Sequence, residues 1–225
     1  MAMTKQLRPV EAESVRILLV DDHPLVREAL AEVLGRRPGC RVCGEAEDRA
    51  GALAVLETCK PDLVILDLAL KNSQGMELIK DIHARDPDLK MLVVSMHDEL
   101  VHAERAVRAG ACGYITKQEA TTKILSAIQR VMSGGIYLSE QVSAHIASKL
   151  AGRPQVSSVE KLADREMQVF ELIGEGLSTR QIAQRLHLGL ATVETYRTRV
   201  KEKLKLKDAV ELLQFAIRWK RDQVI

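Results

Sequence analysis

The fold of this chain is decided first by residues 15–22, whose sequence is VRILLVDD. This run is apolar apart from Arg16, and it ends in two aspartates. A short and nearly continuous apolar run is typical of a strand that is buried on both faces of a sheet. Pro24 follows closely and favours the first turn of a helix, in which apolar residues recur at helical spacing as far as Leu34. The stretch therefore predicts a buried strand followed by a helix.

The same pattern of a short strand and then a helix occurs five times before residue 135. The predicted strands and helices alternate in the order 15–20, 24–34, 41–44, 50–57, 63–66, 76–85, 91–94, 100–109, 113–116 and 120–132. Strands that alternate with helices favour a parallel sheet with helices on both faces. We therefore predict an α/β fold built on a doubly wound, five-stranded parallel sheet.

A second, smaller domain that is all-α is predicted after the sheet. Residues 139–150 have helical spacing, and glycine, proline and serine residues then mark an exposed linker. A short turn at Gly176, with Ser178 as the cap of the next helix, predicts a helix-turn-helix. The predicted organisation is a flexible tail (1–14), the sheet domain (15–135), a linker with a helix (136–158) and the helix-turn-helix domain (159–225).

The composition is that of an ordinary globular protein, with 46% hydrophobic and 28% charged residues among 225. No apolar stretch approaches the roughly 18 residues of a membrane helix, and the N-terminal residues lack the apolar core of a secretory signal. Four cysteines are too few for a disulfide framework, so we expect them to be reduced. The sequence therefore predicts a cytoplasmic protein with no membrane partner.

Positive charge is concentrated in residues 178–207, where eight basic residues stand against two acidic ones. Such an excess suits a phosphate-backbone partner. It is equally compatible with a solvated basic face, and charge alone does not decide between the two.

Polar residues end four of the five predicted strands: Asp21 and Asp22, Asp67, Ser95 and Lys117. In an open α/β sheet the carboxyl ends of the strands form the functional edge. Three carboxylates in one place repel one another unless a cation joins them, and oxygen ligands of this kind suit Mg²⁺. The amine and the hydroxyl could bind phosphoryl oxygens. Aspartate as a simple strand terminator explains one or two of these positions but not the whole set.

These residues, together with Gly75 and the run GYITK at 113–117, resemble the flavodoxin-like receiver domain of two-component response regulators. The resemblance implies that Asp67 accepts a phosphoryl group from a sensor histidine kinase. It also implies a Mg²⁺ site formed by Asp22, Asp67 and the carbonyl of Ala69, with Asp21 acting through a water molecule. Lys117 and Ser95 would bind the phosphoryl group, and Tyr114 would turn inward behind Ser95. Gln118 departs from the proline often found there, so we expect a trans peptide after Lys117.

Residues 158–219 resemble a LuxR-type DNA-binding domain, on the motifs at Arg165-Glu166, 176–178, 182–183, 192–194 and 203–204. The two resemblances place the chain among the NarL/FixJ-type transcription regulators, which are not enzymes. Val193, Val200 and Leu204 are expected in the core. The opposite face of the same helix and its surroundings are expected to bind double-stranded DNA, with base-edge and phosphate contacts. The candidates for these contacts are Arg180, Thr192, Glu194, Thr195, Arg197, Thr198, Arg199 and Lys203.

The last helix carries more apolar residues than one face can bury. We expect Ala209, Val210, Leu213, Ala216 and Ile217 to face the core. Leu212, Phe215 and Trp219 are then left partly exposed, and exposed apolar groups of this size indicate a partner surface. LuxR-type domains are similar to one another in pairing through this helix. We therefore expect phosphorylation to free this helix and the recognition helix from the receiver, and a homodimer, formed on phosphorylation or DNA binding, to read inverted half-sites. The alternative is that Trp219 folds back on the linker or the receiver.

Two further patterns are interpreted as structural. The CxxC at Cys40 and Cys43 falls on a predicted strand and has no second pair, so burial is expected rather than metal or redox chemistry. His97 and His102 lack a third ligand nearby in the sequence, so we expect them at the surface rather than as metal ligands. His97 lies two residues after Ser95 and could still contact the phosphorylation pocket.

Two other functions compete with the phosphorylation-controlled regulator. One is a phosphohydrolase with Asp67 as nucleophile, but Ala69 stands where such enzymes usually have a second acid. The other is a receiver that acts only as a dimerisation module. The presence of the complete Asp, Ser and Lys set argues against this alternative.

Overall fold

The computed structural model describes residues 14–70, 75–151 and 158–222. Of the tail predicted at residues 1–14, only Ser14 lies within the described residues. No helix in the described ranges is both long and apolar enough to cross a membrane.

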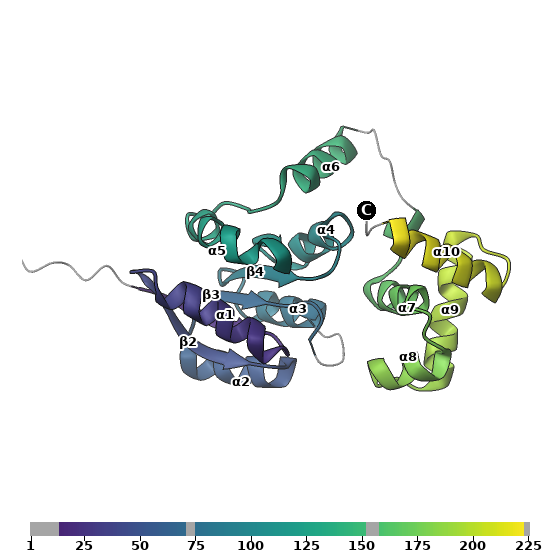
Figure 1. The fold of residues 1–225 in the computed structure, drawn as a ribbon, viewed down its shortest axis with the longest axis horizontal. Coiled ribbons are helices and arrows are strands. Elements are labelled where there is room, and N and C mark those ends of the chain that lie inside the picture. Colours follow the sequence, from purple (N-terminus) through teal and green to yellow (C-terminus); the bar gives the residue numbers. More distant parts are fainter. Residues whose placement is uncertain (1–13, 71–74, 152–157, 223–225) are drawn as a thin grey trace, which may run out of the picture.

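The first half of the chain forms one parallel sheet (Figure 1). Its order is β2-β1-β3-β4-β5, and every neighbouring pair is parallel. The strands are β1 (Val15–Val20), β2 (Cys40–Ala46), β3 (Leu63–Leu66), β4 (Lys90–Ser95) and β5 (Gly113–Thr116). Since the order reverses at β1, the sheet is doubly wound, as the sequence predicts.

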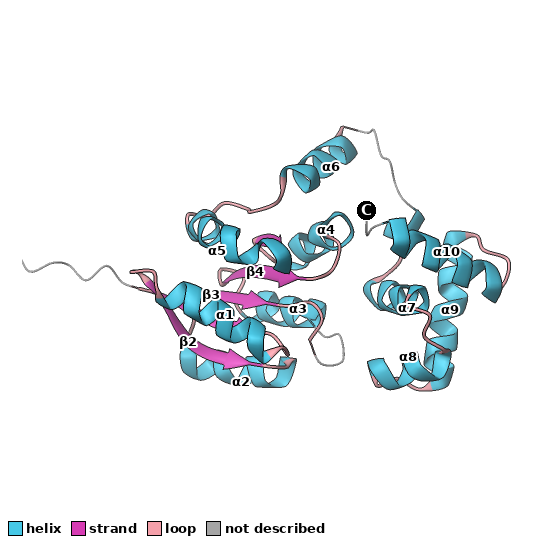
Figure 2. Ribbon diagram, viewed as in Figure 1, coloured by secondary structure: helices cyan, strands magenta, loops and turns pink. Residues whose placement is uncertain are grey.

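Helices cover both faces of the sheet (Figure 2). One face packs against α1 (Pro24–Gly35) and α5 (Lys117–Met132), and the other packs against α2 (Arg49–Cys59), α3 (Gly75–Arg85) and α4 (Glu99–Ala109). Ile17 and Leu19 of β1 point to the first face, and Leu18 and Val20 point to the second. Because side chains alternate along a strand, a strand with two apolar faces must be apolar throughout.

After the sheet the chain forms α6 (Glu140–Leu150), η2 (Ser158–Lys161), α7 (Asp164–Gly174), α8 (Thr179–Leu186), α9 (Leu190–Leu204) and α10 (Ala209–Asp222). Helix α6 packs on α4 of the sheet domain and buries Val142 there. The last four helices and η2 surround a separate apolar core centred on Phe170. In Figure 1 this helical domain lies beside the sheet domain, with α7 toward it.

The cysteines differ from expectation. Cys43 on β2 and Cys59 on α2 form a disulfide, whereas Cys40 and Cys112 are free thiols. The prediction that all four cysteines are reduced is therefore wrong for this pair. Helix α2 packs against β2 and brings together two residues that are 16 positions apart, which a search for neighbouring cysteines does not detect.

Candidate functional site

The acidic pocket lies where β1, β3, β4 and β5 end. Asp21 and Asp22 follow β1, Asp67 follows β3, Ser95 ends β4 and Lys117 begins α5 directly after β5. These strands are parallel neighbours, so their carboxyl ends meet at one edge of the sheet. The structure places all five strand-end residues at that edge.

Lys117 joins two of the carboxylates. Its Nζ lies 2.7 Å from Asp21 Oδ2 and 2.6 Å from Asp67 Oδ2. All three side chains are buried. Burial alone would lower the pKa of the ammonium group, but the charges and hydrogen bonds of Asp67 and Asp21 outweigh it and raise the pKa. Lys117 therefore remains a cation between two carboxylates.

The backbone around Asp67 is closely packed. The Ala69 amide donates a hydrogen bond to Asp67 Oδ1 at 3.1 Å. A Cβ at Gly75 would lie 2.4 Å from the Asp67 carbonyl oxygen and 2.4 Å from Leu68 Cα, so only glycine permits α3 to begin this close to the acceptor. The described residues contain no cis peptide bond, and the expected trans peptide after Lys117 is present.

The carboxylates lie close enough together to share a hard cation. One oxygen each of Asp21, Asp22 and Asp67, with a ring nitrogen of His23, lie within 4.8 Å of one another. His23 Nδ1 approaches Asp22 Oδ1 to 2.7 Å, yet this buried oxygen makes no hydrogen bond within the described chain. A buried carboxylate oxygen without a hydrogen bond is unfavourable unless a cation binds it. The donor set therefore fits Mg²⁺, and His23 is a neighbour that the sequence analysis missed.

A hydrogen-bonded connection leads away from the pocket along the loop after β4. Ser95 is fully buried, and its Oγ accepts a hydrogen bond from the His97 amide at 3.4 Å. Tyr114 is also buried, and its hydroxyl donates to the His97 carbonyl oxygen at 2.9 Å. Burial raises the pKa of Tyr114, so the hydroxyl remains a donor. Tyr114 thus already points inward in this structure.

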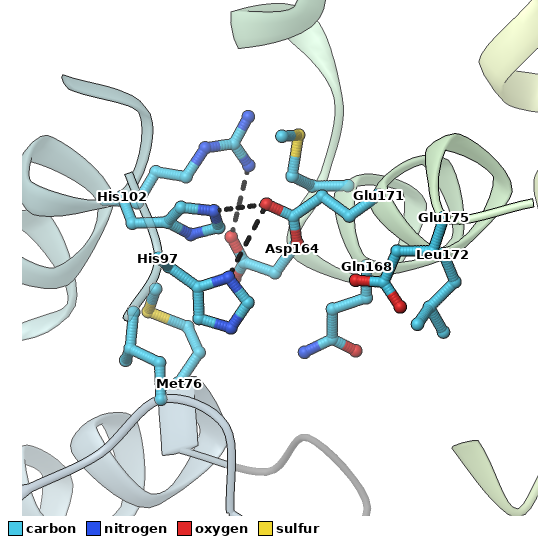
Figure 3. A pocket seen from close by; sticks show the side chains of 11 residues that line it. Met76, His97, His102, Asp164, Gln168, Glu171, Leu172 and Glu175 are labelled. Carbon is cyan, nitrogen blue, oxygen red and sulfur yellow. Dashed lines mark hydrogen bonds and ion pairs between the residues drawn. The ribbon is translucent and has the colours of Figure 1, made fainter. Parts of the chain in front are cut away.

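The two histidines expected at the surface contact the helical domain instead (Figure 3). His102 is 7% exposed, and its Nε2 lies 2.7 Å from Glu171 Oε1 on α7. His97 Nδ1 lies 3.7 Å from the same oxygen. Burial acts to raise the pKa of Glu171, but His102 and His97 hold it well below its usual range. Burial acts to lower the pKa of His97, and the contact with Glu171 more than reverses this. The surface prediction is wrong for His102, which is buried against α7, whereas the His97 side chain contacts Glu171 but is 34% exposed.

Ion pairs extend this interface on either side. Arg105 of α4 lies 3.4 Å from Asp164 Oδ1 and donates to the Glu160 carbonyl oxygen at 3.2 Å. Lys80 of α3 lies 2.6 Å from Asp164 Oδ2, and Lys149 of α6 lies 2.5 Å from Glu160 Oε2. Burial acts to raise the pKa of Asp164, but Lys80 and Arg105 lower it overall. Helices from the sheet domain thus hold η2 and the beginning of α7.

The face expected to contact DNA is formed by α8 and α9. Val193, Val200 and Leu204 are buried, which confirms the predicted core side of α9. Seven of the eight candidate residues are exposed: Arg180, Thr192, Glu194, Thr195, Thr198, Arg199 and Lys203. Thr179 Oγ1 donates to Glu194 Oε1 at 2.8 Å and holds that carboxylate at the surface. Arg197 is mostly covered, with its Nε 3.8 Å from Glu194 Oε2.

Lys203 has a structural contact that its expected role does not include. Its Nζ lies 2.6 Å from Glu166 Oε2, and the Glu166 side chain is 4% exposed. The same carboxylate accepts a hydrogen bond from the Ala163 amide at the beginning of α7. Lys203 therefore neutralises a buried carboxylate, so a loss of DNA binding on its substitution would not by itself identify a phosphate contact.

The prediction for the two faces of α10 is wrong for Leu212 and for Val210, Leu213 and Ile217, whereas Phe215 and Trp219 are partly exposed, as predicted. Leu212 is fully buried, and Phe215 and Trp219 pack on Phe170 with ring centroids 5.9 and 5.2 Å away. The exposed side chains are instead Val210, Leu213 and Ile217, which are 62%, 38% and 45% exposed. Ala216 is buried as expected. The most exposed apolar surface of α10 is therefore formed by Val210, Leu213 and Ile217.

Comparison with known families agrees with this geometry. Residues 17–129 match the response regulator receiver domain, and residues 160–216 match the bacterial regulatory proteins of the luxR family. The chain belongs to the response regulators that join a receiver to a LuxR-type DNA-binding domain, the NarL/FixJ type. It is a DNA-binding regulator of a two-component system.

Similar proteins span nearly its whole length. The DNA-binding transcriptional activator DevR/DosR of Mycobacterium tuberculosis is 33% identical over 210 residues, which cover 93% of this chain and 97% of that protein. The response regulator GacA of Pseudomonas aeruginosa is 34% identical over 206 residues, which cover 91% and 96%. Among solved structures, the RcsB response regulator of Salmonella typhimurium is 25% identical, with a TM-score of 0.57 and coverage of 90% and 98%.

Proposed function

We propose that phosphorylation of Asp67 by a sensor histidine kinase controls whether the LuxR-type domain is held by the receiver or is free to pair on DNA. The observation that supports this proposal is the connection from the acidic pocket to the second domain. It runs from Ser95 through the His97 loop and Tyr114 to Glu171 on α7. A change at the phosphoryl group thus has a physical route to α7. The role is regulatory, and the site of action is the cytoplasm.

In the proposed transfer, a carboxylate oxygen of Asp67 attacks phosphorus, and the bond from phosphorus to the kinase histidine nitrogen breaks. The released imidazole keeps the electron pair. Lys117 is placed to bind an oxygen of the incoming group, and Ser95 is placed to hydrogen-bond another. Asp21, Asp22, Asp67 and the Ala69 carbonyl would hold Mg²⁺, which offsets the added negative charge when it is bound.

The receiver controls the position of the helical domain rather than covering its DNA face. The ion pairs between the domains reach η2 and α7, whereas Thr195, Thr198 and Arg199 of α9 are exposed. This revises the expectation that phosphorylation uncovers the recognition helix. We propose instead that the closed arrangement prevents two helical domains from taking the two-fold arrangement that inverted half-sites require.

The experiment that tests this function measures DNA binding by the full-length protein. A DNA site is first selected in vitro from random duplexes with phosphorylated protein. Affinity for that site is then measured with and without a small phosphodonor and Mg²⁺. We expect phosphorylation to raise affinity at least about tenfold, the range of ordinary coupling between two sites. Equal affinity in both states would contradict control by phosphorylation.

The phosphate contact is tested best at Arg199, which is exposed on α9. Replacing Arg199 with Ala should weaken binding to all sequences alike and reduce the salt slope by about one unit. Thr198→Ala should instead change which sequence is preferred. Both are read from binding isotherms at several salt concentrations. If Arg199→Ala altered sequence preference and left the salt slope unchanged, the two roles would be reversed.

Pairing through α10 is tested at its exposed stripe. Leu213→Glu places a charge between Val210 and Ile217, so we expect it to reduce cooperative binding to a two-half-site duplex about tenfold or more while the domain stays folded. Trp219→Ala is the contrasting change. Because it removes a contact with Phe170, it should lower thermal stability. Sedimentation on one-half-site and two-half-site duplexes separates the effects, and full cooperativity in Leu213→Glu would move the dimer contact elsewhere.

A further inference from the structure

His97, His102 and Glu171 form a cluster that two domains build together (Figure 3). His97 lies in the loop after β4, His102 lies in the first turns of α4, and Glu171 comes from α7. One ring nitrogen of each histidine and one oxygen of the glutamate lie within 4.8 Å of one another. The two rings are tilted, with centroids 4.8 Å apart, so both can direct a nitrogen toward the carboxylate.

Two members of the cluster are largely buried, and there is space beside it. The side chains of His102 and Glu171 are 8% and 13% exposed, and that of His97 is 34% exposed. A cavity of about 60 Å³ adjoins them and is also lined by Gln168 and Glu175. That volume is enough for an ion and a water molecule. Arg105 borders the same cavity, but its guanidinium is paired with Asp164.

Two imidazoles and one carboxylate are a donor set of zinc sites that keep a fourth position open for water. Ligand atoms on one tetrahedral zinc ion are about 3.3 Å apart, from bonds of about 2.0 Å. The separations from Glu171 Oε1 to His102 Nε2 and His97 Nδ1, 2.7 and 3.7 Å, lie on either side of this value. Nitrogen donors also distinguish this cluster from the acidic pocket, whose oxygen donors suit Mg²⁺.

We propose that His97, His102 and Glu171 bind a divalent transition-metal ion, Zn²⁺ in the first instance, at the interface between the receiver and the DNA-binding domain. The third ligand that the sequence lacks near the histidines is supplied by α7, 69 residues further along the chain. A bound ion joins the domains, so it stabilises the closed arrangement by mass action. This effect on signalling rests on the proposed function, whereas the binding itself does not.

The test measures Zn²⁺ binding to the full-length, untagged protein by equilibrium dialysis with metal analysis. All proteins carry Cys40→Ser and Cys112→Ser, which remove the free thiols, and excess Mg²⁺ occupies the acidic pocket. We expect a single zinc ion per chain. Glu171→Gln and His102→Gln should each weaken its binding by more than about tenfold. His83→Gln changes an exposed histidine outside the cluster and should bind like the parent.

Two further readouts keep the result independent of any folding defect. Co²⁺ in place of Zn²⁺ should give the visible absorption of a four-coordinate site in the parent and not in Glu171→Gln. Zn²⁺ should raise the melting temperature of the parent and leave that of Glu171→Gln unchanged. No zinc binding by the parent, or equal binding by the parent and both cluster variants, would overturn the proposal. Because none of these readouts uses phosphorylation or DNA, failure here is distinguishable from failure of the proposed function.

Discussion

Asp67→Asn is expected to abolish phosphoryl transfer to the receiver, with a fall in rate of at least about 100-fold. The amide has the shape of the carboxylate but neither its charge nor its nucleophilic oxygen. The fold should survive, because Lys117 retains its contact with Asp21 at 2.7 Å. Intact-mass measurement after incubation with a small phosphodonor and Mg²⁺ checks this directly, since one phosphoryl group adds a fixed mass.

Asp48→Asn is the matched control for this prediction. Asp48 caps α2 by accepting a hydrogen bond from the Gly51 amide, and asparagine caps a helix about as well. This variant should therefore be phosphorylated like the unchanged protein. If Asp67→Asn gained the mass of one phosphoryl group at the normal rate, another carboxylate, such as Asp22, would be the acceptor.

The receiver could be predicted from the sequence because its signals are local. Four of the strands, β1, β3, β4 and β5, are mostly buried and are therefore apolar runs in the sequence, and the residues at their ends fall at the functional edge. The strands and the pocket residues could be placed in this way. The boundaries of the helices and strands were predicted less accurately. Helix α5 begins at Lys117, three residues before the predicted start, and β2 extends to Ala46, two residues beyond the predicted end.

The faces of α10 could not be assigned from periodicity because two apolar sets fit a helix equally well. One set contains Leu213 and Ile217, and the other contains Leu212, Phe215 and Trp219. The choice depends on Phe170 of α7, which presents an aromatic ring to Phe215 and Trp219. Packing against a residue that is distant in the sequence therefore decides which apolar set of α10 faces the core. The periodicity of α10 alone does not contain this information.

The contacts between the domains could not be predicted either, because the partners are also distant in the sequence. Glu171 is 69 positions from His102, and Asp164 is 59 positions from Arg105. Each is an ordinary charged residue on an amphipathic helix, where a solvated position is the usual outcome. Only the placement of α7 against α3 and α4 makes them partners.

Arg105→Ala is expected to release the helical domain from the receiver without phosphorylation. The Arg105 side chain is 15% exposed and contacts Asp164 and the carbonyl oxygens of Val159 and Glu160. Its removal takes the donor from the Glu160 carbonyl oxygen and one of the cations from Asp164, a cost that falls on the closed arrangement alone. The Val159 carbonyl oxygen still accepts a hydrogen bond from the Leu162 amide. We expect a larger radius of gyration in small-angle X-ray scattering, and DNA affinity that depends less on the phosphodonor.

Arg108→Ala is the control, since Arg108 lies on the same helix but is 78% exposed and pairs only with Glu104 among the contacts seen here. An exposed pair of this kind contributes little. This variant should therefore keep both the radius of gyration and the response to the phosphodonor. If Arg105→Ala were as compact as Arg108→Ala and responded equally, the contacts of Arg105 would not hold the domains together. The pairs Lys80–Asp164 and His102–Glu171 and the apolar contact of Val101 with the helical core would then be the contacts that phosphorylation must break.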